Sequence, residues 1–226
     1  MPLKQARYQG VRAEMQPGDI IAFSGKGHFS ELIKWTTRSQ VSHVGIVYES
    51  KVLFPNGPQQ GRVVDVMEST TLHKDPKTGQ RVAGVQRNRM SLRVRYYEGM
   101  IWWLPLGKES RSKLKLKAFT DFLLHSEGKN YDMPQAIMSA LDAMDGVEIL
   151  DLTTYNQEDF AAFFCSELAA AALEAGGVIK KINASEVTPI DLCTFNLYAK
   201  DYYQIKGRRA KITDFNTRSA EDFGMR

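Results

Sequence analysis

A series of short apolar segments in the first half of the chain most constrains its fold. Each is rich in β-branched or aromatic residues and is bounded by glycine, proline, asparagine or charged residues, as strands are. The last three follow one another through connections too short for the crossover that parallel neighbours need. These segments therefore predict a mainly antiparallel sheet. They are 18–24, 41–49, 62–70, 82–86, 93–97 and 100–104.

Helical signals dominate the second half of the chain. One apolar face predicts a helix over 109–127, and a second helix is expected to begin at the capping residue Asp132. An alanine-rich run predicts a third helix over 165–175, and the two glycines that follow it are a strong stop signal. A shorter helix capped by Ser30 is predicted between the first two strands. Strands followed by helices indicate an α+β fold.

The length and composition suit a single globular domain, because 226 residues with 43% apolar and 25% charged side chains can fill one core. We assign this domain to 17–205, with a last strand over 198–205. Residues 1–16 are then an N-terminal extension, and 206–226 a polar, basic tail that we expect to be loose from about Ile212. The stretch 145–160 is acidic and poorly periodic, so we interpret it as a surface flap.

Net charge and cysteine content limit the partners and the cellular location that we expect. The net charge of +4 favours weak contact with anionic surfaces, but no nucleic-acid reader signature accompanies it, so we expect no stable nucleic-acid partner. Two cysteines make no disulfide framework, and no apolar run reaches the ~20 residues of a membrane span. The first fifteen residues lack the apolar stretch of a Sec signal peptide. We expect a cytoplasmic, reducing location; export with a phage or by another route stays open.

Cys165 is the first candidate for chemistry. It follows two aromatic residues and opens the alanine-rich helical run. A cysteine at a helix start faces unpaired backbone N–H groups and the positive end of the helix dipole, which stabilise a nucleophilic thiolate. The alternative is a small buried hydrophobe, the commoner role of a cysteine.

His43 lies in a strand whose two faces differ. Side chains alternate along a strand, so His43, Gly45 and Val47 share one face while bulky apolar residues occupy the other. Gly45 leaves room beside the imidazole for a substrate or a neighbouring helix end. His43 is therefore a candidate base, with a hydrogen-bonded structural histidine as the alternative.

Glu68 stands near the end of the next strand, on the same face as Val64 and Val66. A carboxylate on an apolar face needs a partner, and a histidine N–H on the adjacent strand would provide one. There it would orient the imidazole and stabilise the imidazolium. Asp65, on the opposite face, is the weaker rival, and a strand-end glutamate in water is the alternative.

The remaining candidates are poorer. Three other histidines have no ligand-like spacing with the cysteines, so we predict no metal site and no cofactor. The Gly25-Lys26-Gly27 segment lacks the upstream glycine and the following hydroxyl residue of a phosphate loop. Cys193 is expected in the core. The three histidines are His28, His73 and His125.

Taken in order, several short motifs resemble a known family, the permuted NlpC/p60 proteins, and most of all the YiiX/YebB-like group of papain-like amidases and peptidases. In ordinary papain-like enzymes the cysteine helix precedes the histidine strand; here, as in this group, the order is reversed. The motifs are Gly18-Asp19-Ile20-Ile21, Ser42-His43-Val44-Gly45-Ile46-Val47, the strand ending at Glu68, Gly128-Lys129-Asn130-Tyr131-Asp132, Phe164-Cys165-Ser166-Glu167-Leu168 and Thr188-Pro189-Ile190-Asp191-Leu192.

The resemblance implies a papain-like α+β fold, in which a small antiparallel sheet or half-barrel packs on a cysteine-bearing helix. It also implies a cysteine hydrolase acting on a peptide, cell-wall-peptide or lipid-like acyl substrate through a thioester. By position, Cys165 would be the nucleophile, His43 the base and Glu68 the orienting acid. The acidic stretch 145–159 and the tail beyond Gly207 have no counterpart in the family pattern. Candidates to line the substrate or hold the oxyanion are Ser42, Gly45, Tyr131 and Ser166.

Two other functions stay open at this stage. One is a lipid-directed acyltransferase or phospholipase like the lecithin–retinol acyltransferase relatives, which share the permuted order. Those have a charged residue directly after an Asn-Cys pair and usually a membrane anchor, whereas here Phe164 precedes the cysteine and Ser166 follows it. The other is a non-catalytic protein that kept the fold and binds a lipid or a peptide tail in the cleft.

Overall fold

One mostly antiparallel sheet organises the molecule. The computed structural model describes residues 2–25, 39–53, 61–74, 76–77, 79–129, 157–221 and 223–224. Within them, seven strands lie in the order β1-β7-β6-β2-β3-β4-β5, and only β1 and β7 run parallel. The strands are β1 (Leu3–Gln5), β2 (Ile20–Ser24), β3 (His43–Leu53), β4 (Gly61–Thr70), β5 (Gly84–Arg89), β6 (Met100–Leu104) and β7 (Tyr202–Lys206).

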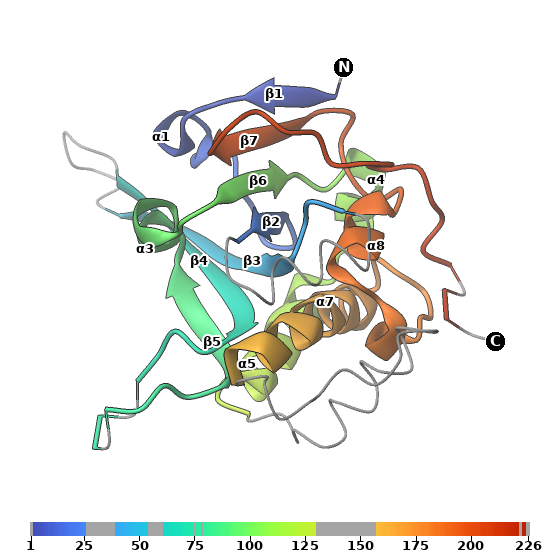
Figure 1. Ribbon diagram of the computed structural model, residues 1–226. Coiled ribbons are helices and arrows are strands. Elements are labelled where there is room, and N and C mark those ends of the chain that lie inside the picture. Colours follow the sequence, from blue (N-terminus) through green and yellow to red (C-terminus); the bar gives the residue numbers. More distant parts are fainter. Residues whose placement is uncertain are drawn as a thin grey trace, which may run out of the picture.

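Helices cover both faces of this sheet, and Figure 1 shows α5, α7 and α8 on one side and α1 and α3 toward the other. The α+β class and the mainly antiparallel pairing are therefore confirmed. The helices are α1 (Tyr8–Val11), α3 (Met90–Tyr96), α4 (Lys108–Lys113), α5 (Leu116–Ser126), α7 (Gln157–Ala175) and α8 (Pro189–Thr194), with a 3-10 turn at Ala184–Glu186.

Alternation along the strands divides the core in two. In β2, Ile20 and Ala22 belong to the cluster that packs on α5, α7 and α8, whereas Ile21 and Phe23 belong to the cluster on the other face. Successive strand residues point to opposite faces, so one strand serves both cores. This two-sided burial explains why 18–24 is apolar without alternation.

The two termini are part of the domain, contrary to our division of the chain. β1 adds to the sheet beside β7, and Tyr8 and Met15 are buried behind it. At the other end, Ile212, Phe215 and Ala220 are buried against the main core, so the described part of the tail is packed rather than loose. Sparse apolar residues in a polar segment are enough to anchor it.

One strand prediction and one helix prediction were wrong. Residues 93–96, predicted as part of a strand over 93–97, form the end of α3, with the Lys206 Nζ donating to the Val94 carbonyl oxygen (2.6 Å) near the helix end. The predicted helix 109–127 is two helices, α4 and α5. Between them the Lys115 N–H donates to the Gly176 carbonyl oxygen (2.8 Å) just beyond α7 instead of continuing a helix.

The end of α7 follows the sequence signal closely. Gly177 has a φ of +77°, and its N–H donates to the Glu174 carbonyl, while the Val178 N–H donates to the Leu173 carbonyl. These two bonds form a Schellman motif, which requires a left-handed residue and so favours glycine. The predicted helices at 30–38 and after Asp132, and the acidic stretch up to residue 156, lie outside the described residues.

Candidate functional site

The fold brings together three residues that are far apart in sequence. His43 opens β3, Glu68 lies near the end of the adjacent β4, and Cys165 lies in α7, which packs on both strands. β3 and β4 run antiparallel, with Ile46 opposite Met67, so the start of one strand meets the end of the other. The predicted nucleophile, base and acid therefore meet at one end of this strand pair.

Cys165 contacts the sheet through its sulfur. Its side chain is almost fully buried, and the Val44 N–H donates to Sγ at 3.3 Å. β3 pairs with β4 only from Ile46 onward, which leaves the Val44 N–H on that side free for the sulfur. A backbone N–H aimed at sulfur favours the thiolate, because hydrogen bonds to the charged form stabilise it.

The expected helix start at Cys165 is wrong. α7 begins at Gln157, about two turns earlier, so the unpaired N–H groups and the positive dipole end lie away from the sulfur. Apolar residues such as Phe163 and Phe164 hid these first turns, because they resemble a strand or loop before the helix. The group that donates to the sulfur is instead the backbone N–H of Val44 in β3.

His43 is held between an acid and the cysteine. Its Nε2 lies 2.8 Å from Glu68 Oε2, and 12% of the His43 side chain remains exposed. Burial opposes a charge on the ring, but the neighbouring Cys165 sulfur, and then Glu68, raise the pKa of His43 from 6.5 to about 9. The imidazole is therefore protonated at neutral pH, and the arrangement suits a thiolate–imidazolium pair.

Glu68 is fully buried and has a second partner that the sequence reasoning missed. Arg93 Nε lies 2.9 Å from Oε1, and its Nη2 donates to Oε2 at 2.9 Å. Burial raises the pKa of Glu68, but the Arg93 guanidinium and the His43 ring outweigh it and hold the pKa below its ordinary value. The carboxylate is thus ionised between two cations.

Arg93 could have been found from its spacing. Met90, Val94 and Tyr97 all pack in the core on this face, so Arg93 lies on the buried side of α3. Positions three and four apart share a helical face. The strand predicted over 93–97 hides this helical spacing, because side chains along a strand alternate every two residues.

The other predicted site residues have different surroundings. A Cβ at Gly45 would lie 2.6 Å from Val66 and 2.8 Å from Glu68, so Val66 and the acid together fill the room that we expected for a substrate. Ser42 is buried and its Oγ accepts from the Gly25 N–H at 3.1 Å. Ser166 is buried beside Cys165 in α7, and Tyr131 lies outside the described residues.

The weaker candidates lie elsewhere. Asp65 pairs with Arg89 at 2.8 Å, on the face away from Glu68. Cys193 is fully buried, and burial raises the pKa of its thiol well above the ordinary value. Among the described residues, no group of three or more histidine, cysteine, aspartate or glutamate side chains is arranged to hold a metal ion.

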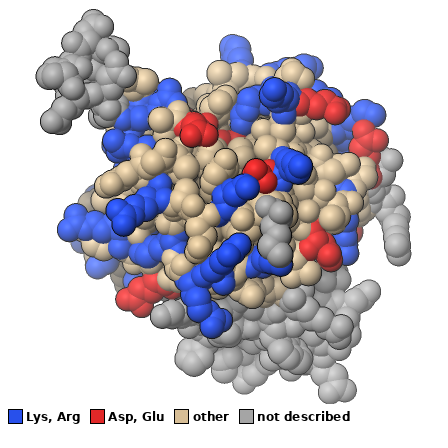
Figure 2. Space-filling view, turned by 90° about the horizontal axis from the view of Figure 1, so that it is seen from above, with Lys and Arg blue, Asp and Glu red and all other residues tan. Residues whose placement is uncertain are grey.

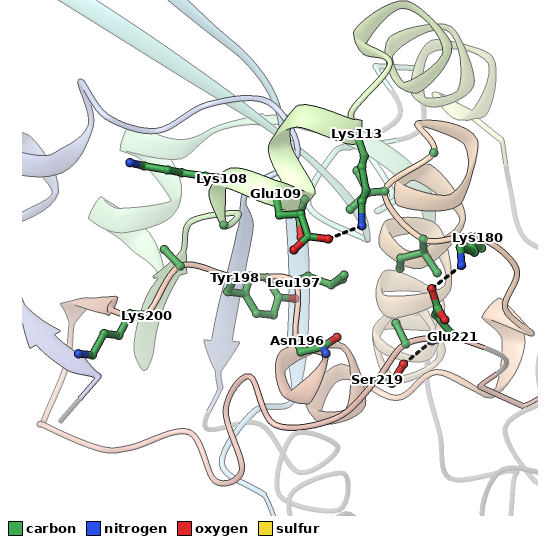
Figure 3. A pocket seen from close by; sticks show the side chains of 17 residues that line it. Lys108, Glu109, Lys113, Lys180, Asn196, Leu197, Tyr198, Lys200, Ser219 and Glu221 are labelled. Atoms are coloured by element: carbon green, nitrogen blue, oxygen red, sulfur yellow. Dashed lines mark hydrogen bonds and ion pairs between the residues drawn. The ribbon is translucent and has the colours of Figure 1, made fainter.

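A cavity of about 790 Å³ lies between α4, the turn after α7 and the C-terminal segment. Figure 3 shows two ion pairs at its wall, Lys113 with Glu109 within α4 and Lys180 with Glu221. None of the three site residues lines this cavity. It is therefore separate from the candidate site.

The surface around the termini carries basic residues. Figure 2 shows Lys and Arg side chains spread over this face with Asp and Glu among them, so the basic charge is interrupted there. Exposed examples near β1 and β7 are Lys4, Arg7, Arg208, Arg209 and Lys211.

No protein-family profile and no curated protein sequence matches this chain. Among the helices in the described part of the chain, none is long and apolar enough to cross a membrane.

Proposed function

We propose that the protein is a cysteine hydrolase of amide, peptide or ester bonds with a permuted papain-like fold. The observation that carries this proposal is the placement of His43 between Glu68, at 2.8 Å, and the sulfur of Cys165. A nucleophile, a base and an orienting acid in contact are what covalent acyl transfer requires. The order of the elements, with the histidine strand before the cysteine helix, is the permuted one.

The chemistry follows the protonation states of the three groups. The Cys165 thiolate attacks the substrate carbonyl carbon, forming a C–S bond and a tetrahedral oxyanion. The His43 imidazolium then donates its proton to the leaving amine or alcohol as the C–N or C–O bond breaks, leaving a thioester. His43, now neutral, takes a proton from water, whose oxygen attacks the thioester carbon. The C–S bond then breaks, the acyl group leaves as a carboxylic acid, and the thiolate–imidazolium pair is restored. Glu68 orients the ring and stabilises its charge.

Val44 supplies the backbone donor for this mechanism. Its N–H points at Sγ from 3.3 Å, so it lies next to the position of the oxygen on a carbonyl carbon bonded to that sulfur. Backbone N–H groups aimed at a developing oxyanion are the usual stabilising device in acyl transfer. Cys165 lies in the interior of α7, so its own N–H serves the helix and is not this donor.

Alkylation of Cys165 tests the proposal without knowledge of the substrate. We expect iodoacetamide to modify Cys165 at pH 6, where an ordinary thiol reacts slowly, and His43→Ala to slow this reaction by about tenfold or more. Cys165→Ala should lose the modification, whereas the buried control Cys193→Ala should keep it. Peptide mass spectrometry locates the label. Equal rates in the folded wild type and His43→Ala would remove the histidine from the mechanism.

A further inference from the structure

Arg93 has more contacts with the candidate site than a surface arginine needs. Its guanidinium meets both oxygens of Glu68, and only 11% of its side chain is exposed. The same guanidinium lies over the ring of Phe23, 4.8 Å from its centroid, and 5.1 Å from the centroid of Tyr97. A planar guanidinium makes such two-point and stacked contacts together, which a lysine cannot.

Glu68 needs this cation because burial alone would neutralise it. Its side chain has no exposed surface, and an ionised carboxylate in such a place persists only with strong partners. Arg93 donates to Oε2 through Nε at 3.2 Å and Nη2 at 2.9 Å, on the same oxygen that His43 contacts. Oε1 accepts no hydrogen bond from the described residues and lies 2.9 Å from Arg93 Nε as an ion pair. If Arg93 were absent, the carboxylate would keep one partner on one oxygen.

The position of Arg93 is itself fixed by the fold. Met90, one turn before it on α3, is fully buried, and Lys206 Nζ donates to the Val94 carbonyl oxygen at 2.6 Å. The Phe23 ring under the guanidinium also lies 5.3 Å from the His43 ring. The Phe23 ring therefore contacts both cations that bind the acid.

From this geometry we propose that Arg93 is a positioning residue, which holds the Glu68 carboxylate ionised and aimed at His43. The inference rests on the proposed function, since it gives the Cys165–His43 pair a fourth member acting through Glu68. With Arg93 lost, Glu68 takes up a proton or turns away, the imidazolium loses its counter-charge, and the Cys165 sulfur reacts more slowly.

The test is the rate of Cys165 alkylation against pH in the full-length protein. We expect Arg93→Met, which keeps the stem and removes the charge, to slow the reaction at pH 6 by about tenfold, the effect of one pKa unit. Arg93→Lys, which restores the charge, should recover most of the rate. The matched control is Arg89→Met, which breaks an arginine–carboxylate pair with Asp65 of 2.8 Å and should leave the rate unchanged.

A wild-type profile in folded Arg93→Met would overturn the role of Arg93, and so would Arg93→Lys as slow as Arg93→Met. If wild type itself alkylates like an ordinary thiol and does not respond to His43→Ala, the proposed function fails instead. If Arg93→Met does not fold, the role of Arg93 is tested by thermal unfolding of three other variants: Arg93→Lys, Glu68→Gln and the double variant. Coupled losses support the inference, and additive losses overturn it.

Discussion

Asp19 and Glu68 are both fully buried carboxylates paired with an arginine, yet their remaining partners differ in kind. Asp19 Oδ2 accepts from the Trp103 Nε1–H and the Gln16 N–H, each at 2.9 Å. Its Oδ1 accepts from the Leu106 N–H at 2.9 Å and from Arg111. Apart from the guanidinium, every partner is a neutral donor that cannot titrate.

Glu68 instead shares one oxygen with an imidazole. Its partners are Arg93 and His43, and His43 in turn contacts Cys165. A carboxylate among permanent donors holds segments together, whereas a carboxylate bonded to a titratable ring links its charge to a proton. The same residue type thus serves the fold in one place and, on our proposal, chemistry in the other.

The strongest test of this contrast is Asp19→Ala. Removing Asp19 takes the carboxylate acceptor away from the Arg111 guanidinium, the Trp103 N–H and two backbone N–H groups. We therefore expect the free energy of unfolding to fall by about 3–5 kcal/mol. For a chain of this size the melting temperature should fall by about 10 °C. Thermal and urea unfolding measure it.

Asp65→Ala is the control for that loss, because the Arg89 side chain of its pair is 47% exposed to water and the pair should contribute less than about 1 kcal/mol. In the folded Asp19→Ala protein, Cys165 should alkylate at the wild-type rate. A rate as low as that of Glu68→Gln would show that the two carboxylates do not differ.

The pKa of His43 tests the same comparison at Glu68 instead of Asp19. NMR titration of labelled histidines should give a pKa of about 9 in wild type, because Cys165 and Glu68 outweigh burial. Glu68→Gln should lower it toward 6.5, whereas Asp19→Asn should leave it in place. His43→Asn identifies the signal.

The same shift predicts a stability change with a definite sign. The folded pKa lies above the unfolded value of 6.5, so the stabilisation is present in full below pH 6.5 and is lost as pH rises through about 9. We expect at most about 3 kcal/mol in wild type and much less in His43→Asn. Equal urea midpoints at pH 6 and 9.5 in wild type would contradict the raised pKa.

The sequence predicted the structure correctly where one local rule, such as alternation along a strand, determines the position of each residue. Alternation along the strand placed His43 and Glu68 on matching faces, and the apolar face around Glu68 implied a partner. The antiparallel sheet followed from short connections, and the end of α7 from two glycines. These signals are local, and each has few alternatives.

The rest depended on contacts that no local pattern contains. Arg93 meets Glu68 across 25 positions, and Val44 meets Cys165 across 121. The start of α7 was missed because residues before Cys165 resemble a strand, and α3 was missed because it is a short helix held by tertiary contacts. Tertiary packing overrides propensity most easily in such short elements.

Two glycines next to the carboxylates give a smaller, paired test. Gly18 precedes Asp19 with a φ of +88°, so Gly18→Ala strains the backbone and should cost about 1–2 kcal/mol without changing Cys165 alkylation. A Cβ at Gly45 would lie 2.6 Å from Val66 and 2.8 Å from Glu68, so Gly45→Ala should push the β4 side chains, the acid included, away from β3 and slow alkylation severalfold.

Urea unfolding and iodoacetamide rates, measured on the same samples, separate the two outcomes. Gly79→Ala is the control, because its φ of +70° is also left-handed but a Cβ there meets nothing. If folded Gly45→Ala keeps the full alkylation rate, close packing of Glu68 against β3 is not required for the reactivity of Cys165.

The smallest expected effect lies at acid pH, where the two carboxylates act with opposite sign. Arg93 and His43 outweigh burial and hold the pKa of Glu68 below 4.5, so its stabilisation is present above 4.5 and lost as pH falls through the lower folded value. Burial raises the pKa of Asp19 above 3.8, so protonation there favours the folded state. As pH falls from 6 to 4, wild type should lose stability relative to Glu68→Gln and gain it relative to Asp19→Asn. Each change should be on the order of 1 kcal/mol, read from urea midpoints. Two differences moving in the same direction would mean that the carboxylates share one kind of environment, because only opposite pKa shifts give opposite slopes.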